Sequence, residues 1–274
     1  MAAPRAVRLN NDTNLLKLIA IASMLIDHAG ARLFPYTIEF RQIGRLAFPI
    51  FAYSMAAGCV YTRSIGKYAL RVLVFAVLVQ PLYGIAMGHA PAGFDWAGGF
   101  YRIDRILETY YAGHYNILFS LGAGILAIWL IRDGRFELTA LLAAILFVFS
   151  DLYDYGINGV ILMVLLYAFI DRPAASAVAV GLFMLYMGAP LLFTRAWHLR
   201  AGAPFTAEWF GSVQGAFRTQ IYALFALPLI YVPKKTRMKL NKSVFYAFYP
   251  AHLALIHVAR TYCLDFLYAK LPWR

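Results

Sequence analysis

The chain has 274 residues, of which 62% are hydrophobic and only 14% charged, and its mean hydropathy is +0.65. Soluble domains are usually about 45–50% apolar and about 25% charged, so this composition excludes an ordinary water-soluble protein. In a soluble protein the net charge of +12 would favour nucleic-acid binding. In a membrane protein it is first explained by lysine and arginine in cytoplasmic loops, so we expect no nucleic-acid partner.

Apolar stretches recur along the whole chain, and a helix needs roughly 20 such residues to cross a bilayer. They predict an all-α, polytopic transmembrane helical bundle of about nine spans, at 15–35, 42–62, 68–88, 115–132, 138–151, 156–171, 174–194, 217–233 and 244–264. The fifth and sixth are short and could instead form one re-entrant hairpin. We treat residues 1–274 as a single membrane domain, whose basic segment 1–14 lacks the apolar core of a cleaved signal peptide.

The basic residues predict the orientation of the bundle. With segment 1–14 in the cytoplasm, the inside segments hold every lysine except Lys270. The densest basic cluster falls in the loop 234–243, and such clusters mark cytoplasmic loops. The prediction is therefore N-in and C-out, with a basic cytoplasmic loop at 234–243 and the longest loop, 89–114, on the outer face.

Ionisable residues within spans are costly and usually mark function. His28 lies about 20 Å along the first span and His252 about 12 Å along the last, so the two can approach near mid-depth. A neutral imidazole is a natural base for acyl transfer. Neighbouring residues on a helix point about 100° apart, so either the helix breaks near Gly30 or Asp27 and His28 each have a partner on another span. Arg45 is the candidate partner for Asp27; in the alternative interpretation that pair is purely structural and His28 donates to a carbonyl.

Arg63, Lys67 and Arg71 recur at intervals of four residues, which places them on one helical face. At the cytoplasmic end of their span they could hold the phosphates of an acyl-CoA. The alternative is that they set topology and attract anionic lipid, and the same two interpretations apply to the basic loop. No phosphate-loop, serine-hydrolase or zinc motif occurs, so we expect no metal.

Four sequence islands together resemble the TraX family. They are Leu16 to Ile21 continuing to Met24 to His28, Ile43 to Ala52, Asn116 to Leu121, and Phe248 to Leu253. The family resemblance implies a multi-pass protein of the bacterial inner membrane that acetylates the N-terminus of conjugative pilin. Where the family commonly has an acidic residue before the third-span proline, this chain has Gln80, which puts a proton relay through that position in doubt.

The resemblance also implies roles for individual residues. Acetyl-CoA is the expected acetyl donor, with Arg63, Lys67 and Arg71 near its phosphates. We expect His28, Asp27 and His252 to be catalytic, and Arg45, Asn116 and Tyr249 to bind substrate or steady the oxyanion. The expected product is an acetylated amine or hydroxyl.

Several features stay open at this point. The acceptor could be a protein, a glycan or a small molecule, and the protein could form a homo-oligomer in contact with membrane lipid. The main rival function is a proton-coupled transporter or exporter, in which the intramembrane histidines and Asp27 form a proton path. The absence of an evident repeat between the two halves of the chain argues mildly against it.

Overall fold

A computed structural model describes residues 7, 9, 12–89, 114–189, 219–233, 236 and 241–264. These residues are mainly helical and form no strand, although one isolated bridge joins Tyr115 and Tyr153. The elements in chain order are α1 (Thr13–Arg32), α2 (Ile38–Gly44), α3 (Ala47–Tyr61), α4 (Ile65–Met87), α7 (Ile117–Arg132), α8 (Phe136–Val148), the 3-10 turn η1 (Ser150–Leu152), α9 (Gly156–Ala168), α10 (Pro173–Gly188), the 3-10 helix η3 (Thr219–Phe225), α13 (Ala226–Tyr231), α14 (Lys242–Val258) and the π-helical turn η4 (Ala259–Leu264).

Every predicted span coincides with a helical segment, so the all-α prediction is confirmed for the part of the chain that the structure describes. Three helical stretches, 13–32, 38–61 and 65–87, are long and apolar enough to cross a membrane. Five more apolar stretches are shorter, at 117–132, 136–148, 156–168, 173–188 and 219–231. The chain thus has the helices of a membrane protein. The loop predicted at 89–114 lies outside the described residues except at its two ends, as do most residues of the basic loop 234–243.

The second span differs from the prediction because it is two helices. The chain leaves the helical path between Gly44, which ends α2, and Ala47, which begins α3. Pro49 lies in the first turn of α3, where a missing backbone donor costs little. By contrast, α1 continues through Gly30, and α4 and α14 run unbroken through Pro81 and Pro250. Of the two alternatives for Asp27 and His28, the break near Gly30 is therefore excluded, and partners on other helices remain.

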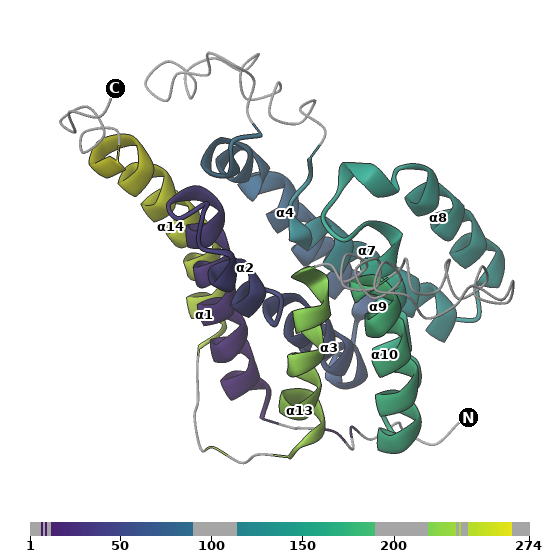
Figure 1. Cartoon of the computed structure of the whole chain (residues 1–274). Coiled ribbons are helices and arrows are strands. Elements are labelled where there is room, and N and C mark those ends of the chain that lie inside the picture. Colours follow the sequence, from purple (N-terminus) through teal and green to yellow (C-terminus); the bar gives the residue numbers. More distant parts are fainter. Residues whose placement is uncertain are drawn as a thin grey trace, which may run out of the picture.

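Helix α3 forms the centre of the bundle, where it packs against α1, α7, α9 and α13 (Figure 1). Its side chains are buried on nearly every side, including Ile50 and Tyr53, which have no exposed surface. The periphery is different. Helix α8 has no buried residue and presents Leu141 and Phe147 at its surface, at the edge of the molecule in Figure 1. An apolar helix exposed in this way suits contact with lipid rather than water.

Contacts at the two ends of the bundle bear on its topology. The side chain of Asp12 accepts a hydrogen bond from the Thr236 hydroxyl, so the start of α1 lies beside the segment after α13, two regions predicted to be cytoplasmic. The turn between α8 and α9 lies beside the start of α7, because Tyr115 N donates to Leu152 O and Asp154 N donates to Tyr115 O. Each of these contacts joins two segments that the sequence predicts to be on one side of the membrane.

The odd number of predicted spans gives a direct test of orientation. A fluorescent protein fused to the N-terminus should fluoresce, and alkaline phosphatase fused to the C-terminus should be active, because the first folds in the cytoplasm and the second only outside it. Whole-cell fluorescence and phosphatase activity measure the two outcomes. A dark N-terminal fusion, or an inactive C-terminal phosphatase, in a protein that is expressed in full would contradict N-in and C-out.

Candidate functional site: two adjoining pockets

Two pockets lie within the helical bundle. The first, which we name the histidine pocket, has a volume of about 310 Å³ and contains His28, His89 and His114 among its lining residues. The second, which we name the tyrosine pocket, has a volume of about 530 Å³ and is lined by Tyr61, Tyr68, Tyr246 and Tyr249 together with mainly apolar side chains.

The chain direction places the two pockets at opposite ends of the bundle. The histidine pocket receives the end of α1, the end of α4 and the starts of α3 and α9. The tyrosine pocket receives the start of α1, the end of α3 and the starts of α4 and α14, and it extends inward to the start of α7 at Ile117, Leu118 and Leu121. Met24, Phe51 and Ile117 line both, so the pockets adjoin at these three apolar residues. We name the two adjoining pockets together the passage, and the three side chains that line both of them its constriction.

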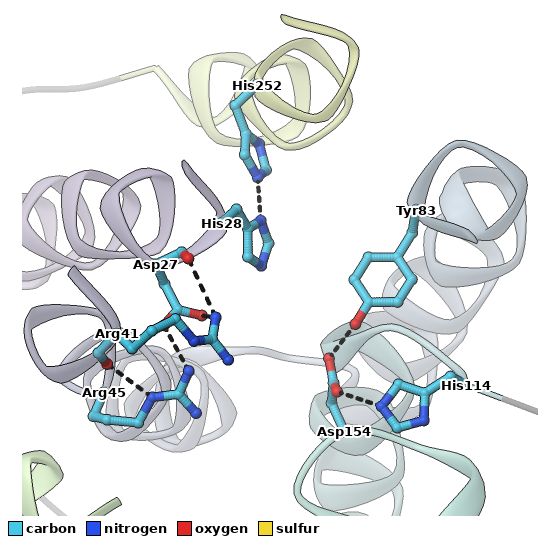
Figure 2. Close-up of polar contacts among 8 residues, drawn as sticks. All are labelled: Asp27, His28, Arg41, Arg45, Tyr83, His114, Asp154 and His252. Atoms are coloured by element: carbon cyan, nitrogen blue, oxygen red, sulfur yellow. Dashed lines mark hydrogen bonds and ion pairs between the residues drawn. The ribbon is translucent and has the colours of Figure 1, made fainter. Parts of the chain in front are cut away.

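Asp27 holds two arginines at one wall of the histidine pocket (Figure 2). Its Oδ2 accepts from Arg41 Nη1 at 2.8 Å and its Oδ1 from Arg45 Nη2 at 2.6 Å. Arg41 Nη1 also donates to the Asp27 carbonyl, and Arg45 Nε donates to the Arg41 carbonyl. The predicted Asp27–Arg45 pair is confirmed, whereas Arg41 was missed. Asp27 makes no hydrogen bond to His28, so its contacts favour a charge-holding role over one of orienting the base.

His28 and His252 form a buried pair between α1 and α14. His28 Nδ1 lies 2.9 Å from His252 Nε2, which confirms the predicted approach of the two histidines. His252 Nδ1 lies 2.9 Å from the carbonyl oxygen of Phe248, and a carbonyl can only accept. In the neutral pair, therefore, His252 carries its proton on Nδ1 and accepts at Nε2 from His28 Nδ1. This polarity leaves Nε2 of His28 as a free lone pair at the histidine pocket, where His28 is a lining residue.

The opposite wall carries an acidic residue that the sequence interpretation assigned only to a turn. Asp154 Oδ2 accepts from the Tyr83 hydroxyl at 2.8 Å, and Asp154 Oδ1 lies 3.5 Å from His114 Nε2 (Figure 2). Burial raises the pKa of the Asp154 carboxyl above its ordinary value, because its hydrogen-bond and cationic neighbours offset only part of the desolvation. Burial and the adjacent His114 lower the pKa of His89. The signal that could have found this wall was an aspartate in a short turn between two apolar stretches.

Tyr155 lines the histidine pocket between the Asp27 wall and the Asp154 wall. It has a positive φ of 62°, a conformation that costs a non-glycine residue on the order of 1 kcal/mol, and its ring stacks on Phe48 at 3.8 Å. Tyr155 immediately follows Asp154 and lines the histidine pocket. The stacked rings therefore hold the turn that delivers Asp154.

The remaining predicted site residues separate into two groups. Tyr249, Arg63 and Arg71 line the tyrosine pocket, and the hydroxyl of Tyr249 is buried without a hydrogen-bond partner. Lys67 and Asn116 line neither pocket. Asn116 caps α7, and its amide donates to Ala76 O and Gln80 Oε1 while its oxygen accepts from Leu118 N. With its amide hydrogens and its oxygen engaged, Asn116 has the contacts of a structural residue.

Comparisons with known proteins show the family of the chain. A family model described as TraX protein matches residues 12–260, which include every residue of both pockets. The chain belongs to the TraX family. The resemblance inferred from the four sequence islands is thereby confirmed, and TraX proteins are associated with pilin and fimbrial assembly.

Two relatives of this TraX protein differ in how much they share with it. A probable fimbrial assembly protein FimC, serogroup H1, of Dichelobacter nodosus is 28% identical over 258 residues, which cover 90% of this chain and 95% of that protein. An uncharacterized protein, RP591, of Rickettsia prowazekii (strain Madrid E) is 36% identical over 70 residues, or 26% of each chain. No solved structure matches the TraX chain.

Gly44 offers a test of the Asp27 anchor in this TraX protein. A Cβ at position 44 would clash with the Asp27 carboxylate, whereas one at Gly181 in α10 would find its nearest neighbour at 3.7 Å. Gly44→Ala should therefore lower stability by roughly 2 kcal/mol or more, through overpacking and loss of the arginine contacts.

The measurement is the thermal unfolding midpoint of the detergent-purified protein. Gly181→Ala serves as the matched control and should be neutral or slightly stabilising, because alanine is the better helix former. Equal midpoints for the two variants would show that α2 does not need its close approach to α1.

Proposed function

We propose that this TraX protein is a membrane-bound acetyltransferase that moves an acetyl group from acetyl-CoA to an acceptor amine or hydroxyl. One observation carries the proposal: two pockets adjoin inside the bundle, and the unengaged Nε2 of His28 stands at the pocket beyond their shared residues. Met24 and His28 are four residues apart on α1, so they lie on one helical face. A donor in one pocket and an acceptor in the other would therefore meet beside the imidazole.

The tyrosine pocket has the chemistry that a CoA thioester requires. Lys17, Arg63 and Arg71 provide cations at its cytoplasmic end under the predicted orientation, where phosphates would bind. Its interior is largely apolar but contains the hydroxyls of Ser54 and Tyr249, both buried and without hydrogen-bond partners. Buried hydroxyls that lack partners are costly, and the amides and carbonyl of a pantetheine arm would satisfy them.

The reaction follows from the polarity of the histidine pair. The acceptor nitrogen or oxygen attacks the thioester carbonyl, a new C–N or C–O bond forms, and the C–S bond breaks. His28 Nε2 takes the proton of the acceptor and returns it to the departing thiolate. His252 stabilises the cationic His28 through its Nε2 lone pair, while the Phe248 carbonyl holds His252 in the required tautomer. We assign the unpartnered Tyr249 hydroxyl of the tyrosine pocket to stabilise the charge that develops on the thioester oxygen.

The acceptor proposed here is a pilin-type protein presented at the outer end of the passage. Two findings support it: the association of TraX proteins with pilin and fimbrial assembly, and a relative named as a probable fimbrial assembly protein. A glycan or small molecule with the same nucleophile would use the same chemistry. The proposed location is the bacterial inner membrane, with acetyl-CoA supplied from the cytoplasm.

Replacement of His28 tests the catalytic assignment. His28→Ala should reduce the rate of acetyl transfer by roughly 100-fold or more, the usual contribution of a general base. The assay follows CoA thiol release from acetyl-CoA by detergent-purified protein, with acceptor present. His257→Ala on the same helix as His252 is the control, because His257 lines neither pocket. A folded His28→Ala protein with the normal rate would end the assignment.

Charge replacement tests the donor site separately. The double variant Arg63→Gln, Arg71→Gln should raise KM for acetyl-CoA roughly 10-fold or more while kcat changes little, because phosphate contacts bind ground state and transition state alike. Arg63 precedes the first residue of α4, so the predicted common helical face holds only for Lys67 and Arg71. Lys67→Gln is the control, since Lys67 lies one turn before Arg71 on α4 but lines neither pocket. Calorimetry with acetyl-CoA, against ATP and free CoA, provides the affinity. If the double variant and Lys67→Gln behave alike, these residues serve topology, and absence of any acetyl-CoA binding by the folded protein favours the transporter.

A further inference from the structure

Arg32 is a cation of the histidine pocket that the acetyl-transfer chemistry leaves unused. It lies in the last turn of α1 and lines the pocket, where its Nε is buried and has no hydrogen-bond partner. No hydrogen bond or ion pair joins its guanidinium to any residue in the described ranges. A buried guanidinium nitrogen without a hydrogen-bond acceptor costs free energy, so an acceptor that entered the pocket would be bound favourably.

The two carboxylates of the pocket do not accept a hydrogen bond from Arg32, because they have other partners. The two oxygens of Asp27 accept from Arg41 and Arg45, and those of Asp154 face Tyr83 and His114 (Figure 2). Arg32 is therefore the cation in excess among the described lining residues. An anion that entered the pocket would find one guanidinium ready to bind it.

A basic residue in the last turn of a helix also has a structural explanation, because it interacts favourably with the helix dipole. That explanation accounts for the charge at position 32 but does not require the side chain to enter a pocket. The end of α1 is already closed by backbone bonds from Leu33 N and Phe34 N to the Ala29 carbonyl. Arg32 is thus not needed as a cap.

The surroundings fix where the guanidinium lies relative to the base. It packs against Gly88, where an added Cβ would lie 2.8 Å from Cζ of Arg32. Gly88 ends α4 with a φ of 75°, a conformation that favours glycine. On α1, Arg32 follows His28 by four residues, so the two share a helical face about 6 Å apart along the axis.

We propose that Arg32 binds an anionic group of the acceptor, a carboxylate or a phosphate, held about one helical turn from the nucleophile that receives the acetyl group. The inference rests on the proposed function only in assigning this ligand as the acceptor. Along α1 the order is then Met24 at the shared constriction, His28 at the reacting atom and Arg32 at the recognition site. Arginine suits this role because its planar fork matches both anions.

The test is a binding measurement that needs no acetyl transfer. Calorimetry on the full-length, detergent-purified protein compares 4-aminobutyrate with butylamine, and 2-aminoethyl phosphate with ethanolamine. Within each pair the amine is kept and the anionic group is removed. We expect the wild type to bind at least one anionic member roughly 10-fold or more tightly than its neutral counterpart, a factor in the range of a charge-assisted hydrogen bond. The two pairs distinguish a carboxylate from a phosphate.

Three variants show whether the preference belongs to Arg32. Arg32→Gln should abolish it, and Arg32→Lys should retain part of it, because the charge remains without the fork. Gly88→Ala should weaken it by displacing the guanidinium while net charge is unchanged. Arg260→Gln, which removes a cation that lines neither pocket, is the control and should bind as the wild type does.

The proposal is overturned if the wild type shows no preference for either anionic member, or if Arg32→Gln keeps the preference. Thermal unfolding of each variant confirms that it is folded. The outcome can be distinguished from a failure of the proposed function. Anion-selective binding without CoA release would support the Arg32 site and contradict the acetyltransferase. Acetyl transfer without anion selectivity would support the acetyltransferase and contradict the Arg32 site.

Discussion

The sharing of one carboxylate by two guanidinium groups is the interaction on which the site depends. Asp27 on α1 binds Arg41 and Arg45, and these contacts hold the short helix α2 against α1. The second span breaks after Gly44, next to these contacts, and α3 begins at Ala47 beside the pocket and passes through the centre of the bundle. A buried network of this kind holds only while all its members are present, because one unpaired charge in an apolar bundle costs several kcal/mol.

The structure separates the ion pairs of Asp27 from the histidine pair of His28 and His252. Asp27 accepts hydrogen bonds from its two arginines. His28 contacts the neutral imidazole of His252, which in turn donates to the Phe248 carbonyl. A carboxylate partner would make His28 more basic but would add another buried charge. The histidine pair fixes the tautomer without that charge, which suits a helix interior surrounded by apolar side chains. The second acidic wall, formed by Tyr83 of α4 and by Asp154 in the turn before α9, faces the same pocket.

The sequence predicted the helices well because apolar length and turn residues are local properties. It also predicted contacts between spans wherever an ionisable residue needed a partner, as for His28 with His252 and Asp27 with Arg45. It did not predict Arg41 or Asp154, because both lie outside the apolar stretches, where a charged residue needs no explanation. Asn116 differs from these residues: the sequence predicts a role in the site, and its hydrogen bonds hold the start of α7. Only the three-dimensional fold reveals which polar groups are already engaged.

The constriction formed by Met24, Phe51 and Ile117 bears on proton leakage across the membrane. A continuous watery conduit lined by histidines, aspartates and arginines would leak protons and dissipate the proton-motive force. Met24, Phe51 and Ile117, which line both pockets, place apolar surface between the two groups of polar residues. Apolar constrictions favour the loss of water, so this boundary disfavours a continuous column of water between the pockets.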